Sequence, residues 1–244
     1  MKLSLGCVTD KGKFRSKNQD RIMCKRKILE NHTIGVACVC DGIGSFSESE
    51  IASQMMINGI NSWFDGIIEY FPKVMGTEQL VDDLEFTIRE LNELVYENSR
   101  QRNTGIGCTM SLMLVMDWEY WIFHVGDSRI YCLRDMLFNM TQDEVILKHI
   151  NGKDKTFLVN YIGKDRTLVL NRYHGCANRE EIFILGTDGL YKKLTYEDVQ
   201  VWLEALDCDE AVERFCSQLV TLMIKRGEKD NISCAVLKLS GKEE

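Results

Sequence analysis

The sequence predicts an α+β fold in which antiparallel sheets are covered by helices. Apolar periodicity indicates a first group of strands, two helices, a second group of strands, two further helices and a last strand. Short turns rather than helices separate the middle strands, and this favours antiparallel hairpins. Two sheets with a helical pair outside each would bury every apolar face of these elements.

The first strands lead to a candidate acid. A short strand is predicted over Met1–Asp10, and a second begins near Ile22. The uncharged run Ile34–Cys40 predicts a strand buried on both faces, and it stops at Asp41. A carboxylate at the end of a buried strand is costly unless a positive charge meets it.

The next segment predicts a pair of helices over one sheet. Apolar stripes at helical spacing run over Ser47–Tyr70 and from about Glu78 to Arg100. Pro72 and Gly76 interrupt the pattern between them. We interpret these stripes as core rather than as a cofactor site.

A strand meander follows the helices. Strands are predicted over Thr109–Met116, Trp118–Val125 and Arg129–Leu133, and a Gly-Asp-Ser turn before the last of them holds Asp127. His124 lies inside an apolar run, where a structural histidine is favoured over a catalytic one.

The region after the meander is polar and irregular. A short helix is expected around Glu144–Ile150 and a strand over Thr167–Leu170. An apolar strand over Ile182–Leu185 leads to the second strand-end acid, Asp188, which is followed by glycine. The glycine lets the backbone bend sharply beside the carboxylate.

Two helices and a strand complete the pattern. A capping box opens a helix from Thr195 to about Ala205, and a longer amphipathic helix covers Asp209–Arg226. The last strand is predicted over Ile232–Leu239, and Asp230 directly precedes it.

Four aspartates stand at strand ends: Asp41, Asp127 and Asp188 follow strands, and Asp230 precedes one. In antiparallel sheets the end of one strand and the start of its neighbour share an edge, so all four could meet at one rim. Clustered carboxylates repel one another, and this implies divalent cations. Oxygen ligands without nearby histidine or cysteine favour Mg²⁺ or Mn²⁺ over zinc.

Composition excludes several classes of function. The 244 residues contain one proline and no low-complexity linker, which favours a single domain over residues 1–244. A net charge of −7 argues against nucleic-acid binding. No apolar run reaches the ~18 residues of a membrane span, and the N-terminus turns polar too early for a signal peptide. The ten cysteines lack framework spacing, so we expect a reduced, cytoplasmic protein.

A polar stretch near the N-terminus allows two interpretations. Arg15 stands close to Asn18, Gln19 and Asp20 before the second strand. The stretch could be a solvated loop. It could also present an arginine fork to an oxyanion, beside an acid able to join a metal site.

Taken in order, the motifs resemble the metal-dependent PPM family, the type 2C serine/threonine protein phosphatases, in its compact bacterial form. They span nearly the whole chain. The matching motifs are Gly12 with Arg15 and Asn18-Gln19-Asp20, Asp41-Gly42-Ile43-Gly44, Gly107-Cys108-Thr109, Val125-Gly126-Asp127-Ser128-Arg129 with Tyr131, Thr187-Asp188-Gly189-Leu190, and Asp230-Asn231.

The resemblance implies a four-layer αββα sandwich with two Mn²⁺ or Mg²⁺ ions at one end of the sheets. It implies that Asp41 bridges both ions and that the carbonyl of Gly42 ligates one. Asp188 and Asp230 would hold the other ion. Asp20 would support the site directly or through water.

The resemblance gives three further residues a role. Arg15 would bind the substrate phosphate, and Asp127 with Asp188 would form a weaker third metal position. Asn231 would orient Asp230 rather than touch metal. A water activated by the two ions would attack phosphorus without a covalent phosphoenzyme.

The expected function is therefore a phosphoserine/phosphothreonine protein phosphatase, a monomer that opposes a serine/threonine kinase. One alternative is a catalytically weak phosphoprotein-binding or scaffold module on the same fold. Another is a regulatory phosphatase acting on an anti-sigma-factor antagonist, although such proteins usually carry extra sensor or membrane regions.

The chain departs from the family pattern at three places. Ile43-Gly44-Ser45-Phe46 replaces the usual Met-Gly-Gly-His after Asp-Gly, beside rather than on the metals. Tyr191-Lys192 stands where relatives often carry Thr-Asp, and a lysine there would weaken the third metal position. The segment before Asp188 lacks the His-Pro-x-Arg-Asn block, so substrate recognition by that segment cannot be inferred from the family.

Overall fold

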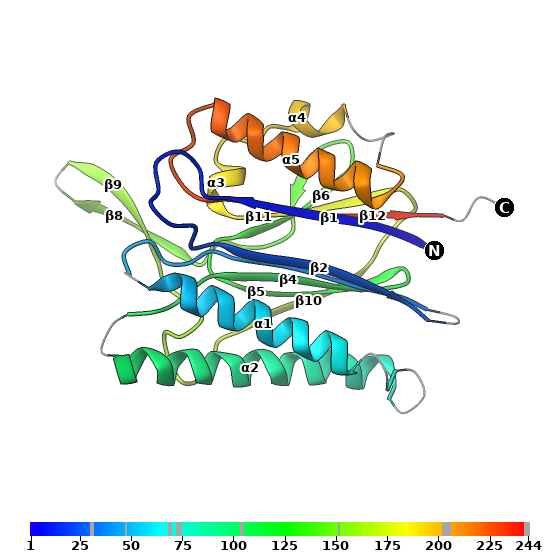
Figure 1. Ribbon diagram of the computed structural model, residues 1–244, viewed down its shortest axis with the longest axis horizontal. Coiled ribbons are helices and arrows are strands. Elements are labelled where there is room, and N and C mark those ends of the chain that lie inside the picture. The colour runs from blue at the N-terminus through cyan, green and yellow to red at the C-terminus, as the bar shows by residue number, and fades with distance from the viewer. Residues whose placement is uncertain are drawn as a thin grey trace.

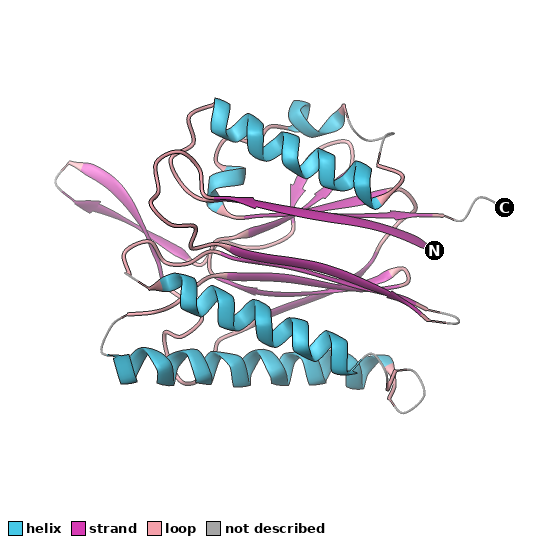
Figure 2. Cartoon of the chain, in the orientation of Figure 1, coloured by secondary structure: helices cyan, strands magenta, loops and turns pink. Residues whose placement is uncertain are grey.

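The computed structural model describes residues 1–29, 32–46, 48–67, 70–71, 75–102, 105–150, 152–201 and 206–241. Two antiparallel sheets lie face to face in the middle of the molecule, and helices cover both outer faces (Figure 1). The predicted four-layer αββα arrangement is confirmed. Figure 2 shows how the helices are confined to the two outer layers, with only strands between them.

Each main sheet has five strands, and a separate hairpin stands apart from both. The first sheet has the order β1 (Lys2–Asp10), β12 (Ile232–Ser240), β11 (Glu181–Gly186), β6 (Arg129–Leu133), β7 (Leu137–Asn139). The second has the order β10 (Asn171–Cys176), β5 (Glu119–Val125), β4 (Met110–Met116), β3 (Thr33–Cys40), β2 (Arg21–Ile28). The hairpin consists of β8 (Val145–Ile150) and β9 (Lys153–Leu158).

The outer layers differ in size. Helices α1 (Ser49–Ile67) and α2 (Thr77–Arg102) form the layer over the second sheet. Over the first sheet, the long helix α5 (Asp209–Lys225) lies with two short ones, α3 (Asp188–Tyr191) and α4 (Tyr196–Gln200). Ser47, Pro72 and Ala205, which marked predicted helix limits, lie outside the described residues.

Apolar side chains fill all three spaces between the layers. Between the two sheets, the residues packed together are fully or almost fully buried, and they include Leu3, Ala37, Val39, Met113, Phe183 and Leu237. Both faces of β3 are therefore covered, as its unbroken apolar sequence predicted. Among the described helices, none is long and apolar enough to cross a membrane.

Two predictions about the segment before β11 were wrong. The expected helix around Glu144–Ile150 is the strand β8, which pairs with β9 across Gly152 in the left-handed conformation (φ 75°). The Asn-Gly pair at this turn is a strong hairpin signal, although its asparagine lies outside the described residues. Thr167–Leu170 forms no strand; pairing with β5 begins only at Asn171.

Strand register brings the four strand-end acids to one edge. Val39 of β3 pairs with Ser111 of β4, and Met110 pairs with Val125 of β5, so β3 and β5 end together. In the other sheet, Gly186 at the end of β11 pairs with Cys234 near the start of β12. The residues just beyond these strand ends, including all four acids, therefore lie at the same end of the sandwich.

Candidate functional site

The strand-end acids surround one small cavity of about 120 Å³. Loops after β1, β3, β5 and β11 and before β12 contribute to its wall. The predicted site residues that line it are Arg15, Asp41, Gly42, Asp127, Asp188 and Asp230. The chain thus brings together side chains that are more than two hundred positions apart in the sequence.

Two hydrogen bonds to Thr109 hold the backbone of Asp41 in place. Its backbone N–H donates to Thr109 Oγ1 at 3.1 Å, and its carbonyl accepts from the Thr109 N–H at 2.8 Å. The Thr109 hydroxyl also lies 2.6 Å from that of Ser128. Removal from water, together with the neighbouring charges of Asp20 and Asp188, raises the pKa of Asp41 well above its usual range.

Gly42 is a position where only glycine fits. A Cβ atom placed there would lie 2.8 Å from the backbone oxygen of Gln19 and 2.9 Å from the Cβ of Ser49. The absence of a side chain lets the turn after β3 pack against the loop that carries Asp20. The two motifs are therefore fixed relative to one another.

Asp20 does not line the cavity but lies buried behind it, only 1% exposed. Its Oδ2 accepts hydrogen bonds from Thr187 Oγ1 at 2.9 Å and from Ser233 Oγ at 2.7 Å. Its Oδ1 is buried and has no hydrogen-bond partner among the described residues. Burial, opposed by the two hydroxyl hydrogen bonds, raises the pKa of Asp20 to about 7.

Arg15 binds Asp230 with both arms of its guanidinium. Nε donates to Oδ1 at 2.8 Å, and a terminal nitrogen donates to Oδ2 at 2.5 Å. This hydrogen-bonded pair raises the pKa of Arg15. The predicted phosphate-binding arginine therefore reaches the cavity, where a carboxylate occupies its fork.

Asn231 fixes the loop that carries Arg15. Its Nδ2 donates to the carbonyls of Lys11 at 2.9 Å and Lys17 at 3.0 Å, and its Oδ1 accepts from the Gln19 N–H at 2.9 Å. Its own backbone N–H donates to Asp230 Oδ1 at 2.9 Å. The side chain thus orders the loop, and the main chain contacts the acid.

Asp188 and Asp127 line both the cavity and the groove beside it. Lys192 Nζ lies 2.5 Å from Asp188 Oδ2, whereas Asp188 Oδ1 is buried without a hydrogen-bond partner among the described residues. Burial raises the pKa of Asp188 despite Lys192, which lowers it. Burial and the charge of Asp188 raise the pKa of Asp127 to about 6.

The donor set fits hard divalent cations. Within the described ranges, no three His, Cys, Asp or Glu side chains are already arranged as a metal site, and Arg15 and Lys192 contact two of the acids instead. The donors are nonetheless oxygens throughout, one buried oxygen each of Asp20 and Asp188 has no partner among the described residues, and the pKa values of four of these acids are raised. A cation would satisfy these oxygens and remove the repulsion.

A larger groove of about 680 Å³ adjoins the cavity. It shares Asp127 and Asp188 with the cavity and extends to the β8–β9 hairpin, and its walls include Phe46, Tyr161, Tyr191 and Phe157. Arg129 lies 3.9 Å above the Tyr191 ring and binds both oxygens of Asp143 at 2.9 and 2.8 Å. The groove is therefore aromatic, with its arginine already paired.

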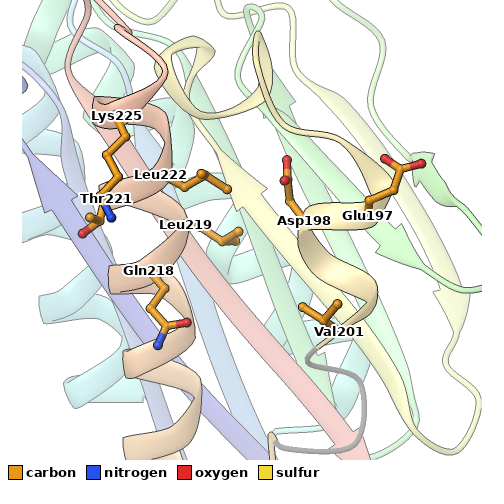
Figure 3. Close-up of a pocket in the computed structure, with 8 residues that line it drawn as sticks. All are labelled: Glu197, Asp198, Val201, Gln218, Leu219, Thr221, Leu222 and Lys225. Carbon is orange, nitrogen blue, oxygen red and sulfur yellow. The ribbon is translucent and has the colours of Figure 1, made fainter.

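A separate hollow of about 470 Å³ lies between α4 and α5. Figure 3 shows its lining side chains, which come from these two helices and from Val201 just after α4. None of the predicted site residues is among them. Its acid Asp198 accepts both arms of Arg226 at 2.5 and 2.7 Å, so its charge is neutralised locally.

Sequence analysis missed several residues that position the acids. Ser233 and Thr187 hold Asp20, and only Thr187 lay in a recognised motif. Glu144 accepts hydrogen bonds from the Gly126 N–H at 2.8 Å and from Asn171 at 2.9 Å, which fixes the turn before Asp127. A lone glutamate in a polar segment gives no signal of this role.

The histidine expected to be structural agrees with that interpretation. His124 is buried, with Nδ1 2.9 Å from Ser111 Oγ and Nε2 3.0 Å from the Gln142 carbonyl. Both ring nitrogens are thus occupied away from the cavity. All ten cysteines are free thiols.

The fold and the carboxylate cavity together indicate a class of protein. Comparison with known proteins identifies this class. The chain belongs to the protein phosphatase 2C family, whose pattern matches residues 15–223. The expected class, a serine/threonine protein phosphatase, is confirmed by this membership.

Curated relatives match nearly the whole chain at low identity. The chain is 22% identical over 247 residues to the serine/threonine phosphatase stp of Listeria innocua, which covers 94% of this chain and 93% of that one. It is 24% identical over 242 residues to the serine/threonine protein phosphatase PstP of Mycobacterium tuberculosis, covering 93% of this chain and 43% of the relative.

Solved structures confirm the fold. The phosphatase Stp1 from Staphylococcus aureus superposes with a TM-score of 0.81 at 21% identity, covering 99% of this chain and 96% of that chain. The catalytic domain of PstP, crystallised in complex with two manganese ions, gives a TM-score of 0.73 at 22% identity and covers 98% of this chain and 99% of its own.

Proposed function

We propose that this phosphatase hydrolyses phosphoserine and phosphothreonine in proteins, with two Mn²⁺ or Mg²⁺ ions held in the carboxylate cavity. The observation that carries the proposal is the convergence of Asp41, Asp127, Asp188 and Asp230 on one cavity that Arg15 also lines. The manganese complex of the similar PstP catalytic domain supports the choice of ion.

The proposed ligands are the side chains of Asp41, Asp188 and Asp230 and the carbonyl of Gly42. When bound, the ions would supply Lewis-acid activation of the attacking water and neutralise charge on the phosphoryl group. Asp20 would support the site from behind, because Thr187 and Ser233 hold one of its oxygens and leave the other free.

Arg15 would bind and orient the phosphoryl group. Its fork now lies on the carboxylate of Asp230, and a phosphate presents the same paired oxygens to a guanidinium. Asn231 would keep the arginine aimed at the cavity by fixing its loop. The adjoining groove would take the peptide residues on either side of the phosphorylated side chain.

The proposal also covers the domain organisation, oligomeric state, compartment and partner of the protein. Residues 1–244 would form one phosphatase domain that acts as a cytoplasmic monomer and opposes a serine/threonine kinase. The similarity to serine/threonine phosphatases over nearly the whole chain supports the kinase partner, and the lack of disulfide-framework spacing among the cysteines supports the compartment. A third metal at Asp127 is not part of this proposal, because Lys192 already contacts Asp188.

A second candidate is a phosphoprotein-binding module with weak catalysis. It is favoured by the cations that contact two of the proposed ligands, since these ion pairs compete with metal binding. The same pairs also offset part of the repulsion among the carboxylates, as a bound metal ion would, so they are equally compatible with the enzyme.

Two measurements separate these functions. We expect purified protein to release phosphate from phosphoserine peptides with Mn²⁺, and to lose this activity in EDTA. Calorimetric titration should show Mn²⁺ binding that Asp41→Asn weakens strongly. Folded protein that binds phosphopeptides but neither binds Mn²⁺ nor turns them over would establish the module instead.

A further inference from the structure

The cavity and the groove meet at Asp127 and Asp188, which line both. Each hollow has one basic side chain in contact with a cavity acid. Arg15 lines the cavity and pairs with Asp230, whereas Lys192 lines the groove and pairs with Asp188. The cavity cation thus contacts an acid outside the aspartate pair, whereas the groove cation contacts a member of the pair itself.

The position of Lys192 follows from the short helix α3. Asp188 is its first residue, and Lys192 follows its last residue, one turn further on, so the two side chains lie on the same face. The Lys192 N–H donates to the Asp188 carbonyl at 3.1 Å, which closes this turn. The ammonium therefore reaches Asp188 Oδ2 without any long-range contact.

The charge of Lys192 acts on both members of the pair. Its ammonium is 2.5 Å from Asp188 and also lies close enough to Asp127 to favour its ionised form. The other nearby basic side chain, Arg129, is bound by both oxygens of Asp143. Among these groove cations, Lys192 is thus the one that offsets the repulsion between Asp127 and Asp188.

We propose that Lys192 is a built-in cation that occupies the groove side of the Asp127–Asp188 pair. The chain would then take divalent ions only in the cavity, and an acid at position 192 would open an additional divalent site in the groove. This inference rests on the proposed two-ion centre. Its physical basis is that an ammonium and a divalent cation compete for the same carboxylate oxygens and repel each other.

The direct test counts Mn²⁺ ions per chain. Free Mn²⁺ is measured from its electron paramagnetic resonance signal during titration of wild-type protein and of Lys192→Asp into the millimolar range. We expect wild type to saturate at two ions and Lys192→Asp to take up a third. The Lys192 side chain is 51% exposed, so its replacement leaves the core intact, and circular dichroism verifies the fold.

Two control variants isolate the position and the charge. Lys192→Arg keeps the positive charge and should remain at two ions. Lys193→Asp makes the same change in net charge one residue away, where the lysine contacts Glu228 at 3.4 Å rather than Asp188, and should also remain at two.

Each alternative result has a definite meaning. Three ions in wild type, two in Lys192→Asp, or a third in Lys193→Asp would overturn the role of Lys192. If wild type binds none, the two-ion proposal fails; a gain of ions in Lys192→Asp alone would then still establish Lys192 as the competing cation, and no gain would reject both ideas.

Discussion

The floor of the cavity and the hairpin at the edge of the groove are built in opposite ways. Asp41 follows the fully buried strand β3, Asp20 is itself buried just before β2, and hydroxyl or backbone hydrogen bonds fix both. The β8–β9 hairpin projects from the body of the molecule, and its Leu147 side chain is 68% exposed (Figure 1). Metal chemistry needs fixed oxygens, whereas the contacts of a peptide substrate can vary, so we place chemistry on the floor and selectivity at the hairpin.

A substitution at the floor of the cavity should have the largest effect on phosphatase activity. Replacing Asp41 by asparagine removes a charged side chain proposed as a metal ligand in the cavity. Phosphatase activity should therefore fall roughly 10³-fold or more, since each tenfold loss in rate corresponds to only about 1.4 kcal/mol of activation free energy. Steady-state assays with a phosphoserine peptide and Mn²⁺ measure this. Asp65→Asn, which alters an exposed acid paired with Lys25, is the matched control and should keep full activity. Normal turnover in Asp41→Asn would show that the floor does not carry the chemistry.

Arg15 lies at the wall of the cavity, so its removal should cost less. For Arg15→Ala we expect a loss of about 10²-fold in kcat/KM, most of it as a higher KM, because a charge-assisted fork to the phosphate is lost. Arg15→Lys should recover part of the loss but not the bidentate geometry. An unchanged KM for the phosphopeptide would remove Arg15 from phosphate binding.

The metal-free cavity should also make the stability of the protein depend on pH. The pKa of Asp127 is raised to about 6 in the fold, against about 3.9 in an unfolded chain, so the folded state binds more protons between these values. The free energy of unfolding therefore falls as pH rises from about 4 to about 6. Thermal melts in EDTA should show this fall for wild type and a shallower one for Asp127→Asn. Equal slopes of stability against pH for the two proteins would contradict the raised pKa of Asp127. Burial lowers the pKa of His124, so this residue makes the opposite contribution to the pH dependence of stability; the contribution is present in both proteins and cancels in the comparison.

A substitution in the β8–β9 hairpin should have the smallest effect on catalysis, and only with peptide substrates. Leu158 lines both the cavity and the groove, whereas the next residue, Val159, lines neither. Leu158→Ala should raise KM for a phosphopeptide by a few fold, about the cost of a few lost apolar contacts, and leave hydrolysis of p-nitrophenyl phosphate unchanged. Val159→Ala should change neither substrate. Equal effects on both substrates would place Leu158 in the chemistry rather than in selectivity.

The same contrast explains which site residues could be predicted from the sequence. Asp41 and Asp188 come after apolar strand segments and are each followed by glycine, so local sequence predicted their place at the rim. Ser233 gives no such signal, because its bond to Asp20 joins residues 213 positions apart. The register of two sheets decides that contact, and no local pattern encodes it.

The errors fell in the exposed region for a related reason. The strands β8 and β10 lack the buried apolar runs that announce β3 and β11, since most side chains of β8 are exposed and those of β10 alternate between exposed and half-buried. Their structure depends on the turn at Gly152 and on pairing with β5. The lysine at position 192 was visible in the sequence, but its contact with Asp188 emerged only from the helix that joins them.

The place of β12 has a consequence for biosynthesis. It lies between β1 and β11, and the loop after β1 is tied to Asn231 just before it. Arg15 and Asp230 are 215 positions apart, so on the ribosome Arg15 has no Asp230 to meet until the segment that carries β12 has emerged. We therefore expect the contact between the proposed phosphate-binding arginine and Asp230 to form only after β12 has inserted between β1 and β11.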